Sequence, residues 1–370
     1  MNILVGIIGV IILFIILQDA FESIVLPRRV SRRIRLARLF YTTTWSAWAA
    51  SARKIHALDR QEYFLSYYGP LSLIMLLVIW ALGLLLGFAS LQWACGSALN
   101  ALGQKAANFG TDLYMSGTTL FTLGLGDVTP RTDMARIVTV IESGTGLAFL
   151  ALVLSYLPII YQAFSRREVA ISLLDAHAGS PPTAIELLRR HTHGQVMDEL
   201  VEHLQDWEHW SADLLESHLS YPVLIYYRSQ HDRQSWLAAL TAILDVCALL
   251  VVGIDSVPRK TAWFTFAIAS HAAVDLGQSY TRPLETRISR LSHDDYVKLT
   301  GALATLGIRL HDEETAEQRL AELRQRYEPY IMALARRLQM PLPGWLPDED
   351  TADDWQTSAW SHGQREALSS

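Results

Sequence analysis

The residues from Ser116 to Pro130 read SGTTLFTLGLGDVTP and combine glycines, threonines and an acid in an order suited to cation binding. Glycine adopts left-handed backbone angles at little cost, so Gly124 and Gly126 would let successive carbonyl oxygens face one axis. Thr122 adds a hydroxyl at one end of this row of carbonyls, and Asp127 places a carboxylate at the other end, where the ion would enter from outside. Four chains around a shared axis would then replace the hydration shell of a dehydrated cation with oxygen ligands.

The same letters have a plainer interpretation, because glycine turns followed by aspartate are common in surface loops. The flanking sequence favours a membrane-embedded loop instead, since long apolar segments stand on both sides of the stretch. Irregular backbone at membrane depth is tolerated only where protein or water covers it. We therefore interpret the stretch as a re-entrant pore loop.

The core of this loop, Thr122 to Asp127, reads TLGLGD and resembles the selectivity filter of potassium channels, whose usual form is T-V-G-Y-G-D. The resemblance implies a filter completed by Gly126, in which the potassium-binding residues are Thr122, Leu123, Gly124 and Leu125. Leu125 replaces the usual aromatic residue, as in the second filter of two-pore-domain potassium channels. This difference leaves a weakly selective cation channel as an alternative.

The composition divides the chain into a membrane part and a soluble part. Of the 370 residues 51% are apolar, and these concentrate in the first 165. The two cysteines, Cys95 and Cys247, cannot build a disulfide framework or a zinc site unaided. A link between Cys95 residues of neighbouring chains stays open, but free thiols are the simpler interpretation.

The first apolar run, Ile3 to Leu17, has no positive charge before it, which argues against a cleaved secretory signal. At ~1.5 Å per residue it is too short for a ~30 Å hydrocarbon core, so the helix must continue to about Leu26. Asp19 and Glu22 then lie at the interface or face another helix. We favour that placement over a role in an ion pathway.

Charge predicts the topology. Residues 28–60 carry nine Lys or Arg and one acid, interleaved with Trp45 and Trp48, a pattern typical of an amphipathic helix on the inner leaflet. The partner of these arginines is then the lipid bilayer and not nucleic acid. Residues 92–133 hold only two basic and three acidic residues. The positive-inside rule therefore predicts a multi-pass protein of the inner (plasma) membrane, with the amino terminus and pore loop outside and the carboxyl-terminal domain cytoplasmic.

The loop lies between a second span, Pro70 to Leu91, and a third, Met134 to Phe164. Between them we expect a polar loop and a pore helix from Thr111 to Phe121, capped by Thr111 or Asp112. This arrangement resembles the two-helix pore unit of the potassium-channel superfamily over roughly residues 70–164. The resemblance implies a homotetramer, since one loop supplies one wall of the pore.

The third span contains candidate gating residues. Gly146 stands where many inner helices of that superfamily carry a hinge glycine; Gly144 adds flexibility and Pro158 removes a backbone donor. Small residues can also serve only close helix packing, which stays open for Gly144.

Glu142, an ionisable residue within the span, is assigned with Thr119 either to the cavity lining or to support behind the filter. No span is studded with arginines, so steep voltage sensing is not expected, and ligand, lipid, pH and stretch stay open as stimuli.

The remainder of the chain has a helical pattern. Residues 181–183, Pro-Pro-Thr, start a helix, and the apolar segments 236–252 and 261–276 are shorter than about twenty residues, which favours buried core helices over spans. A Rossmann-like nucleotide-binding domain is not expected, because no G-x-G-x-x-G follows a strand pattern. A cluster of acids and histidines could hold a divalent metal, but a solvated, pH-sensitive face is favoured. Its members are Asp198, Glu199, Glu202, His203, Asp206, Glu208, His209, Asp213, Glu216 and His218.

Taken together, the sequence predicts an all-α, pore-loop membrane protein that is a channel and not an enzyme, because no G-x-S-x-G, P-loop or H-E-x-x-H motif is present. Potassium is expected as the permeant ion, with no other cofactor and with any cytoplasmic ligand left open. A receptor or scaffold with a vestigial pore is the alternative of another class. The predicted boundaries are 1–27 for an amino-terminal transmembrane helix, 28–68 for a basic linker, 69–165 for the pore domain, 166–342 for a helical domain and 343–370 for a disordered tail.

Overall fold

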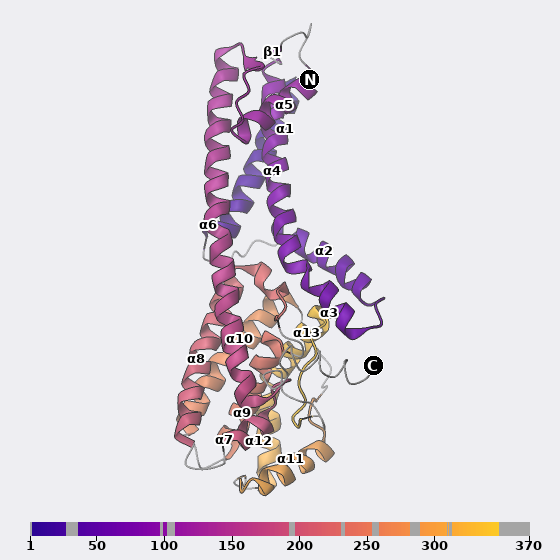
Figure 1. Ribbon diagram of the computed structural model, residues 1–370, viewed down its shortest axis with the longest axis vertical. Helices are drawn as coiled ribbons and strands as arrows, with labels where there is room; N and C mark the ends of the chain where they lie inside the picture. Colours follow the sequence, from indigo (N-terminus) through magenta and orange to yellow (C-terminus); the bar gives the residue numbers. More distant parts are fainter. Residues whose placement is uncertain are drawn as a thin grey trace, which may run out of the picture. The chain divides into compact units, whose positions relative to one another are not determined.

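The computed structural model of the chain describes residues 2–26, 36–96, 99–101, 108–191, 197–230, 234–253, 259–281, 289–308, 310 and 313–347. Nearly all described elements are helices (Figure 1). The α-helices and the short 3-10 or π-helices (η) are α1 (Asn2–Ala20), η1 (Phe21–Val25), α2 (Leu36–Ala52), α3 (Leu58–Ser66), α4 (Tyr68–Ala94), α5 (Phe109–Leu120), α6 (Asp133–Ala178), α7 (Ala184–His191), α8 (Met197–Ser220), η2 (Pro222–Tyr226), α9 (Trp236–Gly253), α10 (Arg259–Tyr280), α11 (His293–Thr305), α12 (Glu313–Arg324) and α13 (Glu328–Leu338). Two short strands, β1 (Leu99–Ala101) and β2 (Val128–Pro130), pair antiparallel.

The chain forms two compact units, and the first contains residues 1–162 and 220–224. In it, α4 packs against α1 along one side and against α5 (Figure 1). The α1–α4 contact is close because glycines line it: a Cβ added at Gly9 would lie 2.8 Å from the carbonyl oxygen of Gly87, and one at Gly83 would lie 2.6 Å from Ile16. Gly83 and Gly87 form a G-x-x-x-G pair, which permits such backbone approach between membrane helices.

Asp19 joins helices of this first unit, which agrees with its expected placement facing another helix. Helical structure continues from α1 through η1 to Val25. Asp19 lies near the end of α1, and its side chain is buried. Its carboxylate accepts hydrogen bonds from the indole Nε1 of Trp80 on α4 (2.9 Å) and from the backbone N–H of Ala37 at the start of α2 (3.1 and 3.2 Å). An acid at a helix amino terminus satisfies a free N–H and interacts favourably with the helix dipole.

The tryptophans expected at the lipid surface pack within the protein instead. Trp45 of α2 is buried against Tyr68, with ring centroids 4.8 Å apart, and Trp48 stacks on Phe64 of α3 at 4.5 Å. The expected single amphipathic segment is thus two helices, α2 and α3, that share an aromatic core. The arginines expected before them, at positions 28, 29, 32, 33 and 35, lie outside the described residues.

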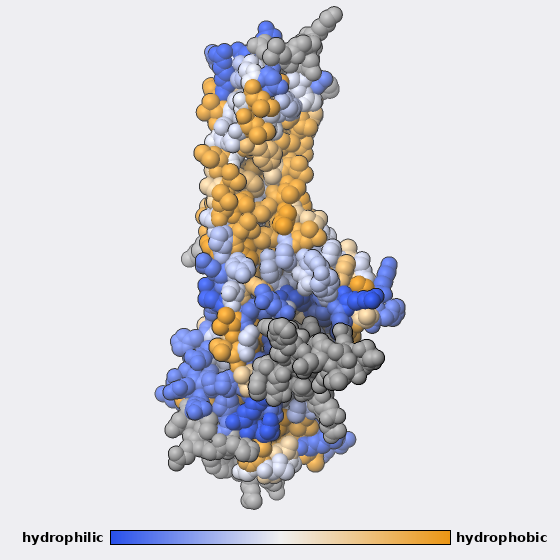
Figure 2. All heavy atoms as spheres, in the orientation of Figure 1, coloured by the Kyte–Doolittle hydropathy of each residue, from blue (hydrophilic) through white to orange (hydrophobic). Residues whose placement is uncertain are grey.

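Among the residues that the structure describes, four helical segments are long and apolar enough to cross a membrane: Ile3–Val25, Leu58–Ala94, Asp133–Ala178 and Trp236–Gly253. Figure 2 shows the hydrophobic residues gathered over the helices of the first unit. Only 11% of the apolar window of α6 is buried, whereas 94% of that of Trp236–Gly253 is enclosed by other helices. By this measure α9 is a core helix of the second unit, as its length suggested.

Helix α6 extends beyond the expected end of the third span. It continues without a break from Asp133 to Ala178, because no proline or glycine follows Phe164 until Gly179. Gly179 has φ +85°, the left-handed conformation that commonly ends helices, and Pro181 follows two residues later. The third span is therefore one part of a 46-residue helix.

The second unit, residues 163–219 and 225–370, is a helical bundle around α9. Helices α7, α10, α12 and α13 all pack on α9. Within this core Asp245 forms an ion pair with Arg290 (2.9 Å) and accepts a hydrogen bond from the hydroxyl of Tyr327 (2.7 Å). A buried charge needs such partners, because leaving it unpaired in the interior is costly.

Two details of the second unit differ from expectation. The predicted tail still packs at its start, where Trp345 is buried beneath the guanidinium groups of Arg290 and Arg324; residues 348–370 lie outside the described residues. On α8, His218 is fully buried beside Arg167, so the predicted solvated face does not include it.

Candidate selectivity filter and its support

The predicted filter follows a well-capped pore helix. The cap of helix α5 is Asn108, three residues before the expected cap Thr111. Asn108 forms a capping box with Thr111: the Asn108 side chain accepts from the Thr111 N–H at 3.0 Å, and the Thr111 hydroxyl accepts from the Asn108 N–H at 3.3 Å. Two helix-end donors are thereby satisfied. The sequence signal for this cap, an Asn three residues before a Thr, was available but was assigned to the wrong residue.

The carboxyl end of α5 is joined to the filter by backbone hydrogen bonds. The carbonyl of Thr119 accepts from the N–H of Thr122 (3.0 Å), and that of Thr118 accepts from Leu123 (2.7 Å) and Gly124 (3.2 Å). Carbonyls that a helix end would leave unpaired therefore fix the first residues of the filter. For Thr119, predicted to line the cavity or support the filter, the structure shows this backbone contact.

The filter backbone alternates in handedness. Thr122, Gly124 and Gly126 have φ of +58°, +55° and +76°, and the leucines between them do not have positive φ. A threonine at positive φ is strained, since its branched Cβ crowds the backbone, and such strain costs on the order of 1–3 kcal/mol. Strained backbone of this kind clusters at functional sites.

Asp127, predicted at the pore mouth, is held on two sides. Its Oδ2 accepts a hydrogen bond from the hydroxyl of Tyr114 on α5 (2.9 Å), and its Oδ1 accepts from the N–H of Val128 (3.1 Å). Val128 begins β2, in which Val128 pairs with Ala101 of β1. Sequence reasoning missed both Tyr114 and the strand pair, since nothing in the sequence shows that residues thirteen positions apart meet.

Glu142 lies behind the pore helix. Its side chain is fully buried and accepts a hydrogen bond from the hydroxyl of Ser116 on α5; that hydroxyl also lies 3.1 Å from the carbonyl oxygen of Leu85 on α4. The three helices α4, α5 and α6 therefore meet at one polar contact. Of the two roles left open for Glu142, this geometry favours support over cavity lining.

The three candidate hinge residues have different surroundings. A Cβ at Gly144 would meet no heavy atom within 4 Å, whereas one at Gly146 would overlap the backbone of Leu120 at the end of α5. Pro158 lies inside α6, which continues through it. Gly146 thus packs against the pore helix, whereas Gly144 is exposed in the single chain.

The filter residues are largely open in the single chain. The side chains of Leu123 and Leu125 are each 63% exposed, and the described residues 121–127 all lie at the surface. Exposed leucines beside irregular backbone are unusual on the solvent-exposed surface of a monomer, and contiguous apolar patches mark interaction sites. One loop can supply only one wall of a cation-binding axis.

Comparison with known proteins identifies an ion-channel segment in the chain. Residues 74–163 match the family described as "Ion channel". The chain is also similar to the uncharacterized membrane protein YdjJ of Bacillus subtilis (strain 168), with 27% identity over 217 residues. That alignment covers 58% of this chain and 62% of the relative, so the chain spans less than two thirds of the relative's length.

No solved structure matches the chain. The matched segment contains most of α4, all of α5, the predicted filter and the part of α6 that carries Glu142, Gly144 and Gly146. Residues 74–163 therefore match a pore-loop ion-channel domain, and the described residues of the chain form a mainly helical membrane protein that carries this domain.

Proposed function

We propose that this protein is a passive potassium channel in which four identical chains contribute the segment from Thr122 to Gly126 to one filter. The observation that carries the proposal is the alternation of positive φ at Thr122, Gly124 and Gly126 in a TLGLGD segment of an ion-channel domain. Such a backbone suits a row of carbonyl oxygens that replaces the hydration shell of the ion. Potassium is the permeant ion, and no further cofactor takes part.

The exposed leucines of the filter and the exposed apolar face of α6 support the tetramer. In the proposed assembly these surfaces face the other three chains and the lipid bilayer. The measurement is the mass of the detergent-solubilised protein, corrected for bound detergent. We expect four copies of the 41.5-kDa chain.

The proposed orientation places the amino terminus and the filter mouth outside and the second unit in the cytoplasm, in the cell's inner (plasma) membrane. The excess of basic residues at 28–60, compared with residues 92–133, supports it. Gating is assigned to bending of α6 near Gly144 and Gly146. Since α6 continues into the second unit as far as Ala178, a change in that unit has a covalent route to the inner helix.

Flux from liposomes that contain the purified full chain tests the function, with potassium and then sodium as the permeant cation. We expect flux with potassium and little with sodium. Equal flux would favour the weakly selective channel that Leu125 leaves open. No flux with either cation would favour a receptor or scaffold with a vestigial pore.

A matched pair of glycine variants makes this assay specific for the filter. Gly124→Ala puts a side chain at φ +55°, where it is strained, and should abolish flux. Gly301→Ala makes the same chemical change in helix α11, where a Cβ has no neighbour within 4 Å, and should leave flux unchanged. Loss of flux in both variants would show that the effect of Gly124→Ala does not come from the filter.

A further inference from the structure

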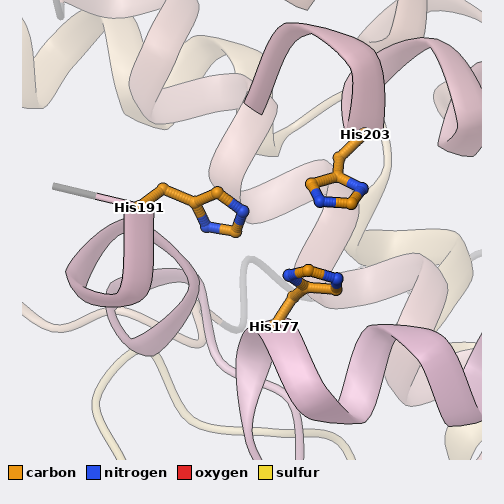
Figure 3. Close-up of side chains that lie close together, drawn as sticks. All are labelled: His177, His191 and His203. Carbon is orange, nitrogen blue, oxygen red and sulfur yellow. The ribbon is translucent and has the colours of Figure 1, made fainter. Parts of the chain in front are cut away.

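Three histidines from three helices of the second unit lie together. His177 is near the end of α6, His191 ends α7 and His203 is on α8 (Figure 3). A nitrogen atom from each ring lies within 4.8 Å of those from the other two. The centroids of the His177 and His203 rings are 4.0 Å apart, and His191 lies 5.3 and 5.4 Å from them.

The ring nitrogens of these histidines are available as ligands. The Nδ1 of His191 lies 2.8 Å from the carbonyl oxygen of Leu187, and since a carbonyl only accepts, Nδ1 carries the proton and Nε2 keeps its lone pair. Histidine ligands are usually fixed in this way by an outer partner. Among the residues that the structure describes, no hydrogen bond occupies the ring nitrogens of His177 or His203.

The charges around the cluster also suit a cation. Three acids of α8 lie close enough to His203 to interact with it electrostatically: Asp206, Glu199 and Glu202. Carboxylates near three imidazoles favour a bound cation, because opposite charges attract.

One cation already lies near the site. Arg190 lies close enough to His177 to interact with it electrostatically, but its guanidinium is engaged elsewhere. It contacts the carboxylate of Glu186 at 2.6 Å and donates to the carbonyl oxygen of Ala176 at 2.6 Å. Its charge is therefore partly neutralised by Glu186.

We propose that His177, His191 and His203 bind one divalent transition-metal ion of the zinc class, with water at the fourth position. Three nitrogen ligands and one open position are a common zinc arrangement. Calcium and magnesium prefer oxygen ligands, so three imidazole nitrogens suit them poorly. Zinc–nitrogen bonds of ~2.0–2.1 Å in a tetrahedron place nitrogens roughly 3.4 Å apart, so small side-chain rotations would complete the site. The ion would join the end of α6 to α7 and α8. This metal site is separate from the proposed conduction through the filter.

The direct test uses full-length protein purified without a polyhistidine tag, treated with a chelator and then titrated with cobalt or zinc. We expect one cobalt per chain with the visible absorption of a tetrahedral site, displacement of cobalt by zinc, and a higher unfolding temperature with zinc. Magnesium should produce none of these changes. Absence of stoichiometric binding would overturn the proposal.

Variants on one helix separate the site from general surface binding. His203→Gln should weaken zinc binding by at least ~100-fold, the upper end of the loss seen when only an outer partner is removed. The control His209→Gln, at an exposed histidine of α8, should bind zinc like the unmodified protein. His177→Gln repeats the test at a half-buried ring of α6. Unchanged zinc affinity in the folded His203 or His177 variant, or an equal loss in the His209 variant, would contradict the assignment.

Discussion

The backbone of Leu120, at the end of the pore helix, occupies the space that a side chain on Gly146 would need: an added Cβ would lie 2.9 Å from the Leu120 carbonyl carbon and overlap its oxygen. Gly146 therefore lets α6 approach the start of the filter. Gly146 is a candidate hinge, but any larger residue there would displace the pore helix whether or not α6 bends. A substitution of Gly146 therefore does not test bending alone.

The hinge hypothesis is tested better at Gly144, where a Cβ meets nothing within 4 Å. Gly144→Ala should lower the open probability in single-channel recordings, because alanine stiffens a helix relative to glycine. Its unfolding temperature should not fall. An unchanged open probability would remove Gly144 from the gating mechanism. Gly146→Ala, the comparison variant, should lose conductance and stability together.

Tyr114→Phe should loosen the pore mouth. It removes the hydroxyl that donates to Asp127 and keeps the aromatic ring. This hydrogen bond is exposed, so water competes for both groups, and we expect its loss to affect the position of Asp127 more than the stability of the fold. We expect reduced potassium-over-sodium selectivity or faster loss of current, read from reversal potentials and current decay.

The matched control for that variant is Tyr63→Phe on α3, where the hydroxyl contacts only the hydroxyl of the exposed Tyr67 among the described groups. It should leave conduction unchanged. If Tyr114→Phe conducts and selects like the unmodified protein, the contact with Asp127 is dispensable for the filter.

Asp19→Ala should reduce stability without altering conduction. The variant loses the acceptor of the Trp80 indole and of the α2 amino terminus, with an expected cost of about 1–3 kcal/mol. Denaturant or thermal midpoints measure the loss, and Glu22→Gln, at a half-buried acid one turn later, serves as the control. A change in potassium permeation through the folded Asp19 variant would instead place Asp19 in an ion pathway.

Asp245→Ala should destabilise the second unit far more than an exposed pair does. Arg290 loses its 2.9 Å partner while staying buried, and breaking a buried pair on one side costs about 3–5 kcal/mol. Asp275→Ala breaks the more exposed pair with His271 and should cost about 0–1 kcal/mol. Similar unfolding midpoints for the two variants would show that the buried network contributes little.

Local sequence determined what could be predicted. The filter segment, its flanking apolar helices and the core position of α9 depend on runs of residues that are contiguous in the chain. The end of α6 could also be predicted from the sequence, since no proline or glycine follows Phe164 before Gly179.

Contacts between distant residues could not be predicted. The Asp19 carboxylate meets Trp80 sixty-one positions away, and His203 meets two histidines on other helices. Within α8 the same His203 looked like one of many scattered polar residues, because the neighbours that matter come from α6 and α7. Helical spacing predicts which residues share a face but not which helix covers that face.

The most direct test of a potassium-selective filter is the reversal potential of the reconstituted full chain, with potassium on one side of a planar bilayer and sodium on the other. Selection by the carbonyls of Thr122 to Leu125 predicts a reversal potential far from zero, with the sign that opposes potassium leaving its own side. It also predicts no measurable current in Gly124→Ala and an unchanged reversal potential in Gly301→Ala. A reversal potential near zero in the unmodified protein would contradict potassium selectivity.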